Sequence, residues 1–313
     1  MIRLIVAAAL VLAAIDVAAA QSTLRVGDQK GNSQAVMEAA GVLKDVPYKI
    51  EWKEFAAAAP LLEALGAGAI DTGLVGDAPF TFAAAAKIPV KAIAAVRQSR
   101  DGLAVLVPEN SAIKSFDDLR GKKIATGRGS IGHQLILAAL ESRGWKASDV
   151  QIVFLAPSDA KVAYTQGAVD AWSTWEPYVS QEEVLFKSRR VITADGITPG
   201  LGFQVATPDA IKAKRAELED FVRRLAAARA WSQHNVEGYA ASWGRLMNIP
   251  PAVAVNWLTR AKIRIAPIDD SVVADEQKTI DLYDRWGLIR QKINAADIVD
   301  RSFGVAVEKG AGL

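Results

Sequence analysis

The chain contains no cysteine among its 313 residues, and its two histidines are His133 and His234. The absence of cysteine excludes disulfide bonds, thiol nucleophiles and a lipidated cysteine at a mature N-terminus. Two distant histidines, with no HExxH, GxSxG or P-loop pattern, disfavour a metal centre, the common hydrolases and nucleotide-binding enzymes. We therefore expect no catalytic residues, no metal and no cofactor. The enzymatic alternative that stays open would use carboxylates alone, at Asp77, Asp170 or Glu176.

A strong charge of either sign is also missing. The 37 basic and 35 acidic side chains leave a net charge of +2, and no long basic run occurs. This balance gives no reason to expect a nucleic-acid partner. Hydrophobic residues make up 51% of the chain and charged residues 23%, which indicates a folded globular protein. A chain of 313 residues exceeds what one hydrophobic core usually organises, so we expect two lobes.

Long apolar runs are confined to the N-terminus. Residues 4–15 are all apolar, but this run is shorter than the roughly 20 residues that span a bilayer. Arg3 precedes the run, and Ala18-Ala19-Ala20 follow it as a cleavage site. This order predicts a secretory signal peptide at residues 1–20, with a retained signal-anchor as the alternative. We expect the mature protein to be periplasmic, not lipidated and monomeric.

From residue 21 onward, short apolar runs typical of strands alternate with helical patterns. This rhythm predicts an α/β fold in which each of two lobes is an open mixed sheet flanked by helices. Thr207-Pro208 offers a helix cap followed by a proline at the first helical position, and it opens a long helical region. Strands are predicted at residues 24–26, 48–52, 72–75, 90–96, 103–107, 123–125, 151–155, 169–172, near 191, and 201–206.

The order of the strands predicts that one lobe is inserted into the other. Residues 21–107 together with 203–313 form the first lobe, and residues 108–202 form the second. The chain then crosses between the lobes twice. Two crossings make a hinge of the kind that lets two lobes close on a ligand.

Four of the predicted strands end in a polar turn that leads directly into a helix. The turns lie at residues 28–32, 76–78, 127–130 and 174–177. In open α/β sheets, ligands bind in the crevice beyond the carboxyl ends of the strands. The first turns of the following helices direct unpaired N–H groups and a partial positive charge into that crevice. Two turns fall in each lobe, so the sequence predicts a small anion held between the lobes by backbone amides.

Side chains at these turns can add hydrogen bonds and apolar walls to the site. Gln29 and Ser130 offer an amide and a hydroxyl, whereas Trp172 and Trp175 can enclose an apolar tail. The predicted ligand-binding residues are Gln29, Lys30, Gly76, Asp77, Ala78, Arg97, Gly129, Ser130, His133, Trp172, Trp175 and Glu176.

Several of these residues have a structural alternative. His133 lies early in its predicted helix and can serve as a packing or capping residue, and Asp77 can cap the helix that follows it. Arg97 can lie on the solvated surface instead of near the ligand. Trp172 and Trp175 can equally belong to a core.

The same turns resemble those of a known family. The matching stretches read LRVGDQKG at residues 24–31, TGLVGDAP at 72–79, DDLRGKKIA at 117–125 and VDAWSTWEPY at 169–178. With these motifs the chain is similar to the periplasmic aliphatic-sulfonate-binding proteins of ABC importers. That group belongs to the sulfonate, taurine and nitrate branch of type II periplasmic binding folds. The resemblance implies a non-enzymatic protein that captures an aliphatic sulfonate and delivers it to a membrane permease and its ATPase.

The resemblance also implies site residues, and the chain departs from the family at two of them. The turn after Gly129 reads Ser130-Ile131-Gly132-His133, where the family often has a run of serines. Glu176 stands where the family often has Asp, and a carboxylate near an anion needs its own partner or a ligand that carries an amine. Taurine, nitrate or another small ligand are therefore alternatives, as is delivery to a sensor. The residues implied to face the cleft are Gln29, Gly76, Asp77, Ser130, Trp172 and Trp175.

Overall fold

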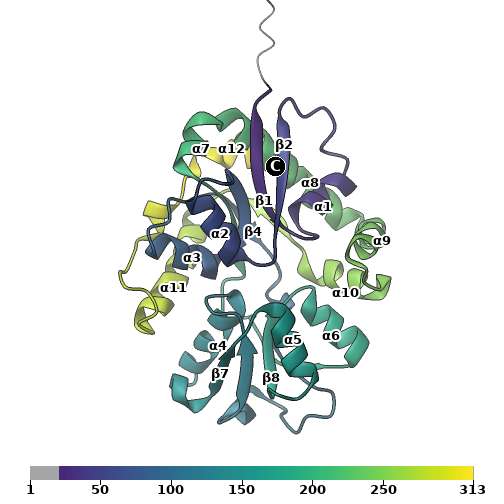
Figure 1. Cartoon of the computed structure of the whole chain (residues 1–313), viewed down its shortest axis with the longest axis vertical. Helices are drawn as coiled ribbons and strands as arrows, with labels where there is room; N and C mark the ends of the chain where they lie inside the picture. Colours follow the sequence, from purple (N-terminus) through teal and green to yellow (C-terminus); the bar gives the residue numbers. More distant parts are fainter. Residues whose placement is uncertain (1–20, 313) are drawn as a thin grey trace, which may run out of the picture.

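A computed structural model describes residues 21–312 and shows two lobes, each built on its own sheet. Figure 1 shows the lobes one above the other, with α4, α5 and α6 in the lower lobe. The predicted signal peptide at residues 1–20 lies outside the described residues. Within residues 21–312, every helix is too short or too polar to cross a membrane.

The first lobe is organised by a six-stranded mixed sheet with the order β11-β4-β10-β3-β1-β2. β1 pairs in parallel with β2 and β3, and β10 runs antiparallel to both β3 and β4. β1, β2, β3 and β4 therefore end at the same edge of the sheet. The strands are β1 (Thr23–Gln29), β2 (Lys49–Phe55), β3 (Thr72–Gly76), β4 (Lys91–Arg97), β10 (Leu201–Ala206) and β11 (Arg264–Ala266).

Helices cover both faces of this sheet because each buries an apolar side against it. One core cluster joins Val26 of β1 to Phe221 and Trp243 from two long helices, and another joins Leu61 to Phe203 of β10. The helices are α1 (Ser33–Ala39), α2 (Ala58–Gly66), α3 (Asp77–Ala85), α7 (Pro208–Ala213), α8 (Arg215–His234), α9 (Val236–Met247), α10 (Pro251–Ala261), α11 (Asp270–Arg285) and α12 (Gly304–Ala311), with short 3₁₀ turns at Ala295–Ile298 and Arg301–Phe303.

The predicted start of the long helical region is confirmed. The Thr207 hydroxyl accepts a hydrogen bond from the Ala210 amide at 3.1 Å, and Pro208 is the first residue of α7. Capping satisfies an amide that the helix itself leaves unpaired. Further along this region, Asn248 adopts a left-handed conformation that ends α9.

The second lobe is organised by a five-stranded mixed sheet with the order β7-β6-β8-β5-β9. β6 is parallel to β7 and β8, so these three strands end at one edge. The elements are β5 (Leu103–Val107), β6 (Lys123–Thr126), β7 (Gln151–Phe154), β8 (Ala171–Trp175), β9 (Arg189–Thr193), α4 (Ile131–Glu141), α5 (Pro157–Thr165) and α6 (Tyr178–Phe186), with 3₁₀ turns at Arg100–Gly102, Phe116–Leu119 and Ala147–Asp149.

The predicted boundary between the lobes at residue 107 is wrong. β5 pairs antiparallel with β8 and β9, so residues 103–107 belong to the second sheet. The chain leaves the first lobe at residues 98–102 and re-enters it with β10, which begins at Leu201. A short apolar run such as β5 fits the centre of either sheet, and its composition does not say which one.

Candidate functional site

The carboxyl ends of the strands in the two lobes meet each other. A Cβ atom placed on Gly76, at the end of β3, would lie 2.8 Å from Cγ2 of Ile131, the first residue of α4. A Cβ atom on Gly129 would lie 3.0 Å from Cδ2 of Phe82 in α3. β1 ends beside β3, and β8 ends beside β6. The turns at residues 76–78 and 127–130 therefore face each other across the boundary between the lobes, and the turns at 28–32 and 174–177 follow neighbouring strands.

Carboxylates of the chain itself already cover two of the four helix starts. Asp28 accepts hydrogen bonds from the amides of Ser33 and Gln34 at 3.1 and 2.8 Å, which satisfies the first turn of α1. Glu176 accepts a hydrogen bond from the Ser180 amide at 3.0 Å in the first turn of α6. The prediction that all four turns offer free amides is thus wrong for α1 and α6.

The start of α4 lacks such a carboxylate, whereas α3 begins with Asp77, whose carboxylate accepts the Ala78 amide. Gly76 is the N-cap of α3 and provides no side-chain cap. Among the residues that the structure describes, the N–H groups of Ile131 and Gly132 have no hydrogen-bond acceptor. Unpaired amides at a helix start favour a bound anion. The capacity to bind an anion is therefore concentrated where α4 begins, opposite the start of α3.

The Ser130 hydroxyl has a structural task in this turn. It accepts a hydrogen bond from the His133 amide at 3.2 Å and donates one to the Gly127 carbonyl oxygen at 2.8 Å. Ser130 thereby caps α4 and closes the turn that presents the free amides. Ser130 was predicted to contact the ligand directly, whereas the structure shows its hydroxyl engaged within the turn.

His133 supports the same turn from behind. Its Nδ1 accepts a hydrogen bond from the Gly129 amide at 3.3 Å, which places the ring proton on Nε2. The ring meets Phe154 edge-on with centroids 4.9 Å apart. Burial, helped by the charge of Arg128, lowers the pKa of His133 to about 4. The structure therefore shows His133 as a packing residue that supports the turn, which was the alternative to ligand contact.

Three predicted residues keep side chains that are free to meet a ligand. Gln29 is half-buried and Lys30 is exposed, and neither side chain forms a hydrogen bond with another residue of the 21–312 range. Trp175 is half-buried at the end of β8 and meets Tyr178 edge-on. These side chains can line the boundary between the lobes.

Trp172 does not belong to this group. Its side chain is 1% exposed and packs against Tyr164 and Tyr178 in a core cluster of the second lobe. Because side chains alternate along a strand, Trp172 and Trp175 point to opposite faces of the sheet. The structure therefore shows Trp172 in the core position that was its alternative, and its contact with a ligand stays a prediction.

Asp77 joins the lobes, and its carboxylate also accepts the Ala78 amide in the first turn of α3. Its Oδ2 accepts hydrogen bonds from Gln134 of α4 and Thr279 of α11, both at 2.9 Å. The side chain is 1% exposed, and burial raises its pKa. Burial also raises the pKa of the neighbouring Glu276 carboxyl, and the negative charge of Asp77 raises it further. Ala78 is fully buried in the apolar cluster between the lobes.

Glu176 and Arg97 are likewise paired within the chain. Nη1 of Arg260, on α10 of the first lobe, lies 3.0 Å from the Glu176 carboxylate. Arg97 donates hydrogen bonds to Asp275 at 3.0 Å and to Ser271 at 2.9 Å, both on α11. The partner that a carboxylate near an anion requires is therefore present for Glu176. Nothing in the local sequence indicates Arg260, because it is far away along the chain.

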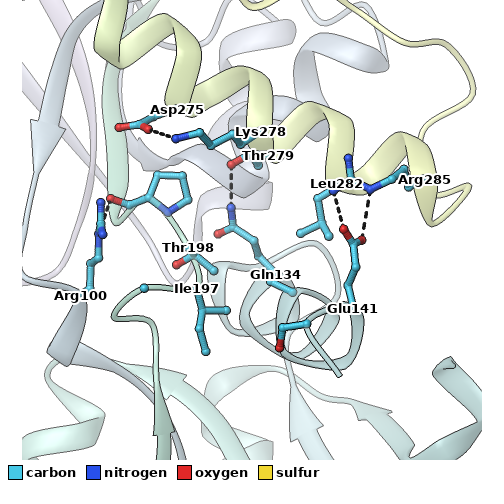
Figure 2. Close-up of a pocket in the computed structure, with 14 residues that line it drawn as sticks. Arg100, Gln134, Glu141, Ile197, Thr198, Asp275, Lys278, Thr279, Leu282 and Arg285 are labelled. Atoms are coloured by element: carbon cyan, nitrogen blue, oxygen red, sulfur yellow. Dashed lines mark hydrogen bonds and ion pairs between the residues drawn. The ribbon is translucent and has the colours of Figure 1, made fainter. Parts of the chain in front are cut away.

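A cavity of about 400 Å³ lies on the other side of the Asp77 contact. Figure 2 shows Gln134 reaching from α4 to Thr279 of α11 beside this cavity. Two cations of its wall, Lys278 and Arg285, have carboxylate partners at 2.9 and 2.7 Å, whereas Arg100 donates to the Pro199 carbonyl oxygen at 3.1 Å. None of the twelve predicted ligand-binding residues lines it. Within residues 21–312, no group of three or more acidic or imidazole side chains is placed to hold a metal ion.

Comparison with known proteins gives consistent relatives over nearly the whole chain. Residues 48–235 match a family model described as NMT1/THI5 like. An aliphatic sulfonates-binding protein of Escherichia coli (strain K12) is 34% identical over 302 residues, which cover 94% of each chain. One from Bacillus subtilis (strain 168) is 31% identical and covers 90% of this chain and 83% of that protein.

A solved structure agrees with these sequence matches. The alkanesulfonate-binding protein SsuA from Xanthomonas axonopodis pv. citri, bound to MOPS, is 30% identical with a TM-score of 0.86. The match covers 91% of this chain and 100% of that one. The chain therefore belongs to the NMT1/THI5-like family, in the group that includes the aliphatic sulfonate-binding proteins.

Proposed function

We propose that this protein is a non-enzymatic, periplasmic solute-binding protein that captures an aliphatic sulfonate or a similar small organic anion between its lobes. It then delivers the ligand to the permease and ATPase of an ABC importer, and it works as a monomer without metal or cofactor. The relatives named as sulfonate-binding proteins support this proposal, since they match over most of their length. The Xanthomonas relative with bound MOPS, itself a sulfonate, supports the ligand class.

One observation carries the proposal: the free amides at the start of α4 lie directly opposite the start of α3. A sulfonate head group stays anionic at every physiological pH and accepts several hydrogen bonds, so it fits unpaired N–H groups and helix dipoles. Each charge-assisted hydrogen bond contributes about 1.5–3 kcal/mol. Three of them reach micromolar affinity, about −8 kcal/mol, once the cost of association is subtracted.

The side chains near these amides suit an organic anion better than a bare inorganic one. Phe82 and Trp175 bring apolar surface to the boundary, and the Gln29 amide can donate a further hydrogen bond. The carboxylates of Asp77 and Glu176 are satisfied by partners from the opposite lobe. We therefore place the head group at the amides of Ile131 and Gly132 that begin α4, and the tail toward the aromatic side chains.

A thermal-shift panel with the mature protein tests the proposal. Alkanesulfonates should raise Tm without being consumed, and a concentration of 100 times Kd should add about 2.7 kcal/mol of stability. Taurine, nitrate and sulfate complete the panel. Stabilisation by nitrate alone would contradict the sulfonate assignment, and turnover of the ligand would contradict the non-enzymatic one.

A matched pair of variants tests the position of the site. Gln29→Ala should weaken sulfonate binding about tenfold, because it removes a hydrogen bond to a charged group. Gln151→Ala, which changes an exposed glutamine at the start of β7, should leave the affinity unchanged. Equal affinities of both variants would place the ligand elsewhere.

A further inference from the structure

Glu176 places a negative charge at the edge where the proposed ligand binds. It follows Trp175 directly, at the carboxyl end of β8. Its side chain is 8% exposed, and a Cβ atom on Gly102, at the first hinge crossing, would lie 2.8 Å from its Cγ. A buried carboxylate this close to an anion site opposes the binding of an anion unless a counter-charge accompanies it.

The counter-charge comes from the other lobe. The Glu176 carboxylate accepts hydrogen bonds from the Ser180 amide at 3.0 Å and the Ser180 hydroxyl at 2.9 Å, and both donors are uncharged. Arg260 of α10 adds its Nη1 at 3.0 Å. Within residues 21–312, no second cation lies within 4.0 Å of this carboxylate.

Arg260 is itself held in place by polar contacts. Its Nη2 donates to Asn256 at 2.8 Å and to Glu183 at 2.5 Å. Glu183 also pairs with Nε of Arg190 at 2.8 Å. Arg190 also lies 4.0 Å from Asp101, so three carboxylates share two guanidinium groups. The loss of Arg260 would therefore leave Glu176 without a cation.

We propose that Arg260 is a specificity-determining residue of the anion site: it cancels the charge of Glu176 and so lets the cleft accept an anion. This inference rests on the proposed function and names the residue that sets the preferred charge of its ligand. An uncompensated charge even about 10 Å from an anion, at an effective dielectric constant near 20, changes Kd by about tenfold or more.

Arg260 and Glu176 lie on different lobes. The preference of the site for an anion therefore depends on whether the lobes are closed. Arg260 reaches Glu176 where α10 packs against α6. If the lobes separate, Glu176 keeps Ser180 but loses its cation. An anion therefore meets a neutral edge in the closed arrangement and a negative edge in the open one, which favours its release on opening.

The test is a double-mutant cycle read by calorimetric titration with ethanesulfonate. Arg260→Met should raise Kd about tenfold or more, because Glu176 stays buried and unpaired. Arg260→Met combined with Glu176→Gln should restore Kd to within about threefold of the wild type. Taurine should lose less affinity than ethanesulfonate in Arg260→Met, since its ammonium group can face the free carboxylate. Arg190→Met, which removes a guanidinium of the same network without uncovering Glu176, is the matched control and should bind like the wild type.

The outcomes separate this inference from the function on which it rests. A wild type that binds no alkanesulfonate refutes the proposed function and this inference with it. A wild type that binds, together with an Arg260→Met variant of equal affinity, refutes this inference alone. Equal weakness of the single and the double variant also refutes it, because Arg260 would then act through the arrangement of the lobes. If Arg260→Met does not fold, the double variant and Arg260→Lys test the inference instead. Both should bind ethanesulfonate with nearly the affinity of the wild type. Weak binding by the double variant overturns the inference.

Discussion

Replacing His133 by Asn should change how the stability of the protein depends on pH. In the folded state the pKa of His133 is lowered from its ordinary value of 6.5 to about 4, first by burial and then by the charge of Arg128. Between these two values the unfolded chain binds the proton and the folded chain does not. The histidine therefore contributes stability that is present above about pH 6.5 and is lost as the pH falls toward 4.

The size of the effect follows from the shift. A difference of about 2.5 pKa units corresponds to about 3 kcal/mol over the whole window, and about 2 kcal/mol of this is lost between pH 7 and pH 5. Asp28 acts in the opposite direction, because burial raises its pKa to about 6. Asp28 is present in both proteins, so its contribution cancels when the variant is subtracted from the wild type.

Urea denaturation at pH 7 and pH 5 provides the measurement. The stability advantage of the wild type over His133→Asn should shrink by about 2 kcal/mol at the lower pH. His234→Asn changes the exposed histidine at the end of α8 and is the matched control for the substitution itself. If the stability difference between the wild type and His133→Asn stays constant or grows on acidification, the conclusion that His133 is neutral, buried and hydrogen-bonded to the Gly129 amide is refuted.

Two further predictions separate core from site. Trp172→Ala should lower the free energy of unfolding by about 3–5 kcal/mol in a melting experiment. Trp175→Ala should lower it less but weaken sulfonate binding more. A larger loss of stability in Trp175→Ala, or a larger loss of affinity in Trp172→Ala, would contradict the assignment of these side chains. Gly132→Ala should lower Tm, because its Cβ would lie 2.6 Å from the Ser173 carbonyl oxygen and overpacking of this kind costs about 1–3 kcal/mol; an unchanged Tm would show that α4 can shift away from β8.

Local sequence patterns were sufficient to predict most of the elements. The alternation of apolar residues, the Thr207 cap and the glycine turns place strands and helices close to their observed bounds. These signals act over a few residues, so they can be read from one stretch of chain. The sheet to which β5 belongs depends on pairing with β8 and β9, which are distant in sequence, and that information is absent from the run itself.

The predicted turns lie at the carboxyl ends of their strands, but several of their side chains have partners that the local sequence does not indicate. Asp77 and Glu176 lie in the predicted turns, yet their partners Gln134 and Arg260 come from helices of the opposite lobe. A carboxylate beside a glycine turn suggests a ligand contact, a helix cap or a contact between lobes, and only the folded arrangement distinguishes these roles. The role of Asp28 at the start of α1 was missed, although a carboxylate five residues before a helix start is a signal that could have been read.

The position of β4 has a consequence for how the chain reaches its native state. Both sheet neighbours of β4 are β10 and β11, which follow it only after the entire second lobe. The second lobe is contiguous and can form its sheet by itself, whereas the apolar β4 stays without a partner until residues 201–266 have emerged. A nascent or newly exported chain therefore carries an unprotected aggregation-prone strand during that interval, and this makes the first lobe the slow half of folding.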